Sequence, residues 1–476
     1  MAKGVRNTHH EYDEYLPVWQ RCEDAVSGQR AVQAAGVRYL PMLTGEKVED
    51  YQARVMRSDY FNATWRTIAG LSGMAFRKAV TTNLPAAIEP FLKNIDLAGT
   101  DMTTMAKLLV EDVLEVGRIG LLVDHPPMPE NVTTITVAVG EQLGLRPTLK
   151  TYDAQSIINW RYRTIGNATV LAMVVLKEEA EVPGDSEFEW GCEDRYRVLD
   201  LDEAGFYRQR VFRINDQTKQ DELVGEPVYP VMRGRKMTYI PFFILGVDGI
   251  QTECDEPPLI DLVDANIAHY QVNSDYRHGL HFTGLPTLFL SGIADEEPLY
   301  IGSARAITSP QPDAKGEYLE FSGQGLGAVE KALASLERRM AVLGARMIAD
   351  ETKQVETLGA TQIKRAGENS ILASAVIAVS DVIERALRVM AEWVGASGEV
   401  VYQINREFTP VAMDAQQLTA LVSAWQAGAV SEAELFDVLK RGDVIDGEKS
   451  LEEHQSEIDV SVTMPRPAND AQQVAA

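Results

Sequence analysis

The chain has 476 residues, 45% of them hydrophobic, and carries a formal net charge of −25 at pH 7. This length allows about three domains of ordinary size, and the hydrophobic share excludes a globally disordered chain. Phosphate contacts supply most of the affinity of proteins that hold nucleic acid, so the acidic balance and the lack of a basic run exclude tight nucleic-acid binding.

The expected compartment is reducing, and no membrane segment is expected. Cys22, Cys192 and Cys254 lie far apart without metal-binding spacing, so they are expected to be reduced thiols of a cytosolic protein. The N-terminal MAKGVRNTHHEYDEY has no apolar signal region. The longest apolar runs, YIPFFILGV and ILASAVIAV, hold about nine residues each, whereas a bilayer span needs about twenty.

The first 120 residues are predicted to be mostly helical. In EKVEDYQARVMRSDYFNATWRTIAGLSGMAFRK, apolar residues recur at near-helical spacing. They are Tyr51, Val55, Tyr60 or Phe61, Trp65, Ile68, Leu71 and Phe76. A further helix is predicted from Asp101 or Thr103 to about Gly117, followed by the short strand GLLVD.

Residues 134–248 change to the spacing of strands. TVLAMVVLKEE, RYRVLDLD, FYRQRVFRI and MTYIPFFIL are rich in β-forming residues and are separated by turns or acidic clusters. These segments predict one antiparallel, partly exposed sheet.

Two helices with an insertion between them are predicted next. Asp255 or Glu256 is the cap of the first helix, and Pro257 and Pro258 fit its first turn. One face of this helix collects Leu259, Leu262, Val263, Asn266, Ile267 and Tyr270. The forty residues that follow hold short strands broken by prolines and glycines, so they predict a small insertion at the far end of a helical pair.

The second helix, VEKALASLERRMAVLGARM at residues 329–347, has two stripes. Its main apolar seam consists of Val329, Leu333, Leu336, Met340, Leu343 and Met347. The stripe beside it consists of Ala334, Ala341, Ala345 and Ile348. A helix with two such sides needs two neighbours. The following ETKQVETLGATQIKRAGEN has almost no apolar pattern.

The last part of the chain is predicted to be helical with one strand. SILASAVIAVSDVIERALRVMAEWVG predicts a long helix with a core face of Ile371, Ala375, Val379, Val382, Ile383 and Met390. EVVYQINREF predicts a strand, and DAQQLTALVSAWQAG and SEAELFDVLKRG predict two short capped helices. The tail from Met464 is expected to be disordered.

The motifs of common enzymes are missing from the sequence. GDVIDGEKS differs from a phosphate-binding loop because Glu448 would face the phosphate oxygens. His278 and His281 lack a third metal ligand nearby, and the acidic run KEEAEVPGDSEFEWGCED is typical of a solvated edge. We therefore predict no catalytic residue, no cofactor, no metal site and no enzyme activity.

Three longer segments carry a family resemblance: YLPMLTGEKVEDYQARVMRSDYFNATWRTIAGLSGMAFRK, PPLIDLVDANIAHYQVNSDYRHGLHFTGLPTLFLSG and LGATQIKRAGENSILASAVIAVSDVIERALRVMAEW. The chain resembles the portal proteins of tailed phages, specifically a group of uncharacterised portal-like chains from phages and prophages. The resemblance covers roughly residues 12–458. It depends on domain order and whole-segment likeness, because portals have no short catalytic signature.

The resemblance implies an α+β portal fold and a homo-oligomeric ring of about twelve subunits at one capsid vertex of the virion, assembled in the host cytoplasm. Double-stranded DNA would pass through the central channel without sequence specificity. The terminase large subunit would dock during packaging and a head-completion adaptor afterwards. The major capsid and scaffolding proteins would be further partners, with no membrane involved.

The resemblance also divides the chain into regions. They are a wing (1–254, a helical part and then an antiparallel sheet), a first stem helix (255–280), a clip (281–325), a second stem helix (326–350), a tunnel loop (351–369), a long wing helix with a strand (370–407), a short helical crown (408–460) and a flexible tail (461–476).

Three sets of site residues follow from this mapping. The tunnel loop would present Glu351, Lys353, Gln354, Glu356, Lys364, Arg365 and Glu368 to passing DNA. The clip would dock partners through Asp295, Glu296 and Glu297. The stem would meet its neighbour at Ala334, Ala341 and Ala345, where small side chains allow close approach. The acidic composition suits a channel that must not adsorb DNA.

Two alternatives stay open at the level of the sequence. One is another structural protein of a phage head, such as a capsid or adaptor subunit, which would lack the helix–clip–helix arrangement. The other, less favoured, is a hydrolase with paired carboxylates in the acidic sheet, which would have a concave catalytic pocket and form a small oligomer.

Overall fold

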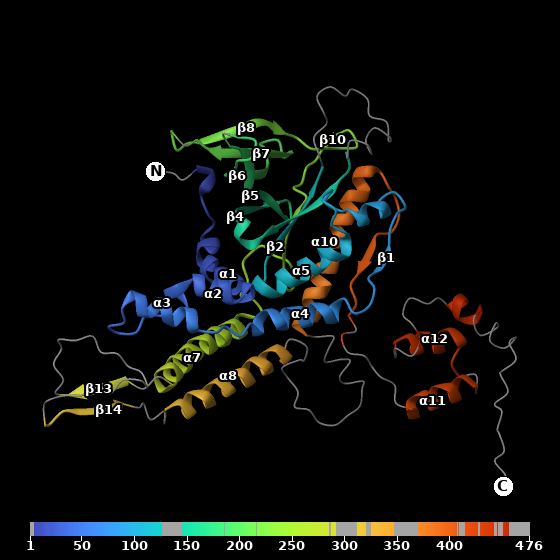
Figure 1. Cartoon of the computed structure of the whole chain (residues 1–476). Helices are drawn as coiled ribbons and strands as arrows, with labels where there is room; N and C mark the ends of the chain where they lie inside the picture. Colours follow the sequence, from blue (N-terminus) through green and yellow to red (C-terminus); the bar gives the residue numbers. More distant parts are fainter. Residues whose placement is uncertain are drawn as a thin grey trace, which may run out of the picture.

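The computed structural model has an α+β fold, as predicted. It describes residues 4–125, 145–184, 186–215, 217–284, 287–291, 312–319, 325–346, 370–406, 408, 415–426, 429–441, 445 and 451–456. Within these ranges no helix combines the length and the apolar character needed to cross a bilayer. Figure 1 shows helices packed below and beside two sheets.

The N-terminal region is helical, as predicted. Its helices are α1 (His10–Ser27), α2 (Gln29–Ala34), α3 (Val48–Arg57), α4 (Ala63–Ala75) and α5 (Met102–Val116), with short 3-10 turns at Gly4–Arg6, Gly36–Arg38 and Glu89–Lys93. Asp101 caps α5 by accepting hydrogen bonds from Thr103 N and Thr104 N, at 2.9 and 3.0 Å. Gly117 ends α5 with a left-handed φ of 70°. Both predicted boundaries of this helix are confirmed.

The apolar spacing before α5 does not belong to one helix. Ser58 ends α3 in an extended conformation, and the Asn62 side chain starts α4 by accepting a hydrogen bond from Trp65 N at 2.9 Å. The side-chain cap at Asn62 creates a new helix start inside a run that is periodic enough for one helix.

The strand-rich region forms two larger sheets and a separate two-stranded sheet at residues 231–236, so the prediction of a single sheet was wrong. The first contains β2 (Ile119–Asp124), β3 (Thr148–Asp153), β11 (Phe242–Gly246) and β12 (Gly249–Ile250), in the order β12-β11-β2-β3. The second is an antiparallel meander of β4 (Ile157–Ile165), β5 (Ala168–Pro183), β6 (Trp190–Leu201), β7 (Tyr207–Ile214) and β8 (Asp221–Val228). Nearly every residue of β2 and β11 is buried, so these strands need cover on both faces and lie in the inner sheet.

Both edges of the five-stranded sheet are obstructed. Along β4, the backbone N–H of His9 donates to Ile158 O at 2.9 Å, and the Asn159 side chain donates to Asn7 O at 2.8 Å. In β8, the pairing with β7 slips between Val224 and Val228. Gly225, with a φ of 74°, lies inside this irregularity, and so does Pro227, which has no N–H to donate.

A helix–hairpin–helix unit follows the sheets, as predicted. It consists of α7 (Ile260–Gly284), β13 (Thr287–Ser291), β14 (Lys315–Leu319) and α8 (Leu326–Arg346). Pro257 and Pro258 lie directly before α7, and the backbone N–H of Ile260 donates to Pro257 O at 3.1 Å. Pro258 is therefore part of the turn that leads into the helix. All six residues of the predicted α7 face are buried.

The remaining elements are α10 (Ile371–Val394), β15 (Val401–Gln403), α11 (Ala415–Gln426) and α12 (Glu432–Arg441), with β1 (Thr81–Asn83) paired to β15, and the small strands β9 (Val231–Met232) and β10 (Arg235–Lys236). Ser370 caps α10. Ser431 and Glu434 form a reciprocal capping box at α12.

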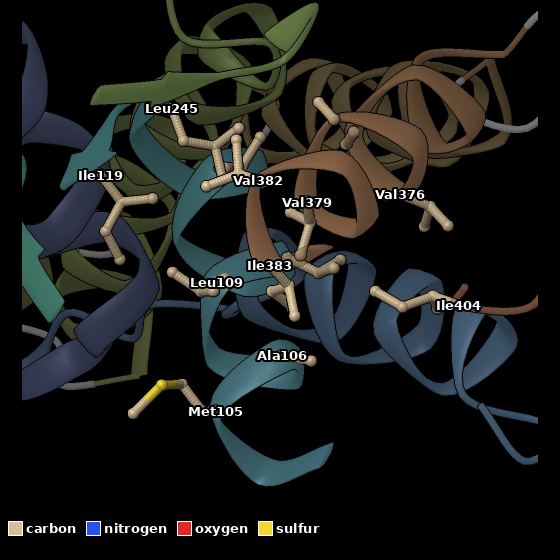
Figure 2. Packing of buried hydrophobic residues seen from close by; sticks show 14 of the residues in the cluster. Met105, Ala106, Leu109, Ile119, Leu245, Val376, Val379, Val382, Ile383 and Ile404 are labelled. Carbon is tan, nitrogen blue, oxygen red and sulfur yellow. The ribbon is translucent and has the colours of Figure 1, made fainter. Parts of the chain in front are cut away.

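Two apolar clusters form the core. In the first, Ala106 and Leu109 of α5 lie near Ile383 of α10, with Val379 one turn away (Figure 2). The second joins the aromatic face of α1 to the five-stranded sheet. Because α7 contributes Leu262 and Ala265 to the first cluster and Val263, Ile267 and Tyr270 to the second, this helix connects the two cores.

Candidate functional site

The α7–α8 pair extends from one side of the body and carries the β13–β14 hairpin at its far end (Figure 1). The helices are antiparallel. His269 Nε2 of α7 lies 3.6 Å from Glu337 Oε1 of α8, and ten residues later in α7 a Cβ added to Gly279 would lie 2.6 Å from the Leu326 side chain. Glycine at position 279 therefore permits the close approach of the two helices next to the hairpin.

The predicted seam of α8 faces α7. Leu333 and Met340 are buried, and Val329, Leu336 and Leu343 are half-buried. The C-terminal end of α8 also reaches the body, because Met340 belongs to the first apolar cluster. The outer side of α8 stays open, and Val342 there is 52% exposed.

Polar contacts attach the other side of α7 to the N-terminal helices. Arg21 Nη1 of α1 donates to Asp264 Oδ1 at 2.8 Å, and Gln271 Nε2 donates to Tyr39 O at 2.8 Å. Together with the two buried contacts described next, they hold α7 along most of its length.

Asn266 is the most buried of these attachments, with 0% exposure. Its Oδ1 accepts from Ala63 N at 3.0 Å and from Thr64 N and Thr64 Oγ1 at 3.1 Å. Its Nδ2 donates to Phe61 O at 2.7 Å. Asn266 therefore satisfies N–H groups at the start of α4 that have no partner within that helix.

Arg54 forms the second buried attachment. Its guanidinium makes a two-point contact with the Glu46 carboxylate, at 2.8 Å for both bonds. It also donates to Pro41 O at 2.8 Å and to Ser274 Oγ of α7 at 3.4 Å. The hydrogen bond from Arg54 lowers the pKa of Glu46 to about 2, so the pair is ionised across the physiological range.

The predicted stem alanines belong to α8. Ala334 is half-buried and Ala341 is exposed, while the side chain of Ala345 is outside the described set. The clip residues Asp295, Glu296 and Glu297 and the tunnel-loop residues Glu351, Lys353, Gln354, Glu356, Lys364, Arg365 and Glu368 also lie outside the described residues.

Two carboxylates of the acidic sheet, Glu178 and Asp200, are paired with basic side chains. Burial alone would raise the pKa of Glu178, but hydrogen bonds from Arg197, Lys150 and Tyr152 lower it to about 2. Asp200 is bound by Arg208 and Arg210, at 2.8 and 3.0 Å. Both carboxylates are thus held by arginine or lysine side chains, which disfavours these two groups as a hydrolytic pair.

Three carboxyl groups between α1 and α5 behave differently. Burial, followed by the charge of Asp153, raises the pKa of Glu23 to about 7 and of Asp112 to about 7. Burial, followed by the charge of Asp112, raises the pKa of Glu115 to about 8. This cluster could not be predicted from the sequence, because Glu23 belongs to α1 whereas Asp112 and Glu115 belong to α5.

One group of potential metal ligands comes together in the described ranges. Donor atoms of His9, His10 and Glu11 lie within 4.8 Å of one another. Glu11 Oε2 already accepts a hydrogen bond from Cys254 N at 2.7 Å, and the group lies at the N-terminal, positive end of α1. Both features disfavour a cation at this place.

Comparisons with known proteins give the following similarities. A family model described as a domain of unknown function (DUF4055) matches residues 258–394, and no curated protein matches the chain. A chain in the virion of a native gene transfer agent (GTA) particle is similar, with 12% identity, a TM-score of 0.41, and coverage of 86% of this chain and 98% of that chain.

Two neck structures give similar values. A chain in the neck of an empty GTA particle computed with C6 symmetry has 13% identity and a TM-score of 0.39, with coverage of 87% of this chain and 98% of that chain. A chain in the neck of a native GTA particle computed with C12 symmetry has 11% identity and a TM-score of 0.39, with coverage of 79% and 89%.

Proposed function

We propose that this chain is a portal-type subunit that forms a ring at one vertex of a phage-like capsid and conducts double-stranded DNA. The α7–hairpin–α8 unit carries the proposal: α7 is bound along one side to α1, α3 and α4, while α8 leaves its outer side open. A ring subunit needs this combination of a rigid attachment and a free flank for its neighbour.

In this proposal the two helices are the stem, and the region around β13 and β14 is the clip. The clip would dock the terminase large subunit during packaging and the head-completion adaptor afterwards, through Asp295, Glu296 and Glu297. Residues 351–369 would form the tunnel loop, where Lys353, Lys364 and Arg365 make weak contacts with passing phosphates. The chain's net charge of −25 opposes tight adsorption of DNA.

The family match covers one continuous part of the proposed mapping. The matched span, residues 258–394, begins just before α7 and ends with α10. This span includes the two proposed stem helices, the clip, the tunnel loop and the long wing helix.

Native mass spectrometry and negative-stain electron microscopy of the purified chain test the proposal. The expected result is a closed ring of about twelve copies with a central opening. A chain that stays a monomer or dimer at high concentration and in several salts would contradict the proposal. A compact small oligomer with hydrolytic activity would favour the enzyme alternative instead.

A further inference from the structure

A pocket of about 400 Å³ opens between the end of α3 and the last turns of α7. Its lining residues are Met56, Arg57, Arg277, Leu280 and His281. It therefore lies beside the proposed stem, close to the end of α7 from which the hairpin begins. Arg277 and Leu280 belong to the first proposed stem helix, but the proposed stem contact at Ala334, Ala341 and Ala345 does not include the pocket.

The cations of this pocket are poorly neutralised. The Nε atom of Arg57 is buried without a hydrogen-bond acceptor, and no carboxylate within the described ranges lies at ion-pairing distance from Arg57. Arg277 pairs with Asp59 at 3.0 Å, but both side chains are about half exposed, at 47% and 51%. Such an exposed pair is weak and exchanges easily for another carboxylate.

His278 of α7 lies near the pocket residue Arg57. Its pKa is lowered chiefly by burial, and then by the positive charges of Arg54 and Arg57. Glu46 and Asp275 act in the opposite direction without reversing the shift. The geometry that carries the charge of the pocket is the presence of two guanidinium groups, Arg57 and Arg277, in its lining.

The rim of the pocket is apolar and uncovered. Met56 is 81% exposed and Leu280 is 43% exposed. Methionine and arginine side chains are enriched in the buried centres of protein–protein interfaces, whereas lysine and glutamate are depleted there. The combination of an apolar rim and arginines suits a protein surface with a carboxylate beside an apolar side chain better than a nucleic-acid backbone, which needs a longer basic track.

We propose that this pocket is a docking surface for a second copy of the chain, which inserts a carboxylate next to an apolar side chain. With 70 acidic and 45 basic residues, each copy presents mainly acidic surface to its neighbours, so a second copy supplies the complementary charge. The contact is heterologous, because the pocket meets a different surface on its neighbour, and contacts of this kind form a ring when the rotation between neighbouring copies closes. This inference builds on the proposed function.

Arg57→Glu tests the charge of the pocket, and Met56→Ser tests its rim. Arg30→Glu is the matched control, because Arg30 is an exposed residue of α2 outside the pocket. We expect Arg57→Glu to reduce the ring fraction at least ten-fold in native mass spectrometry, and Met56→Ser to reduce it several-fold. Arg30→Glu should assemble like the parent chain, and thermal unfolding should be unchanged in all three variants.

A photo-crosslinking residue at position 56 identifies the occupant. Irradiation of a mixture of isotopically light and heavy chains should give light–heavy crosslinks to an acidic segment of the other copy. Normal rings from Arg57→Glu and Met56→Ser, or crosslinks found only within one copy or to added DNA, would overturn the docking surface while leaving the ring intact. A parent chain that forms no assembly overturns both proposals.

Discussion

Asn266 shows how one polar residue in an apolar face positions a whole helix. Its carboxamide contacts three N–H or O–H donors at the start of α4 and one carbonyl. Asn266→Leu would leave buried donors without partners, each at a cost of about 1–3 kcal/mol. We expect a loss of about 3 kcal/mol in the free energy of unfolding, measured with urea.

Asn273→Leu is the control for this change. Asn273 accepts one hydrogen bond, from Asp59 N at 3.3 Å in an exposed setting, so the loss should stay below about 1 kcal/mol. If the two variants unfold at the same urea concentration, Asn266 does not anchor α4 to α7.

The Arg54–Glu46 pair gives a pH-dependent prediction. The pKa of Glu46 falls from an ordinary 4.5 to about 2 in the folded chain. Because the folded pKa is the lower one, the pair stabilises the fold above pH 4.5, and this contribution disappears as the pH falls towards 2. Arg54→Met should therefore destabilise the chain by about 3–5 kcal/mol at pH 7, because the buried carboxylate loses its partner.

The double variant Arg54→Met/Glu46→Gln separates charge from packing. At pH 7 it should be more stable than Arg54→Met. Between pH 5 and pH 3 its free energy of unfolding should fall less than that of the parent chain, in unfolding curves measured at both pH values. Equal slopes in the parent chain and the double variant would show that the pair is not coupled to folding.

At the scale of elements, the α1–α5 contact should weaken in alkali. Glu23, Asp112 and Glu115 have folded pKa values of about 7, 7 and 8, above their ordinary values. Protonated carboxyls are therefore favoured in the fold, and their stabilising effect is complete below about pH 4 and is lost as the pH rises through 7 to 8. Glu115→Gln should raise stability at pH 9 by about 1–2 kcal/mol and flatten this slope.

Glu203→Gln serves as the control for that experiment, because Glu203 is exposed in the turn between β6 and β7. It should leave the slope of stability against pH unchanged. A Glu115→Gln variant that follows the parent chain at every pH would mean that the three carboxyls do not interact in solution.

Elements with strong local signals could be predicted from the sequence, and elements defined by distant partners could not. The limits of α5 follow from Asp101 and Gly117, and the seam of α8 follows from Leu333 and Met340. In contrast, β11 joins β2 across more than a hundred residues, and Arg54 meets Ser274 from 220 residues away. No local period encodes such pairings, so the division into two sheets and the attachment of α7 were missed.

At the scale of the whole molecule, assembly should be separable from folding. Ala341 is exposed on α8, so Ala341→Glu should leave the thermal unfolding temperature unchanged. If the outer side of α8 meets a neighbouring copy, the added charge should sharply reduce the ring fraction seen by native mass spectrometry.

Ala332→Glu, also exposed on α8 but on the other side of the seam, provides the comparison. Its effect on the ring fraction should be smaller. If Ala341→Glu forms rings normally, this side of α8 is not part of the interface. Circular dichroism accompanies each measurement, so that a loss of folding is told apart from a loss of assembly.

The obstructed edges of the five-stranded sheet affect how copies of the chain associate when they are crowded together. An open strand edge can pair with the edge of another chain, and such pairing does not limit the number of chains that join. In this chain residues 7–9 lie along β4, and Pro227 with the left-handed Gly225 interrupts β8. Crowded copies therefore cannot readily extend this five-stranded sheet into fibres. Association through its edges gives way to contacts between side-chain surfaces, whose shape can set a finite number of subunits.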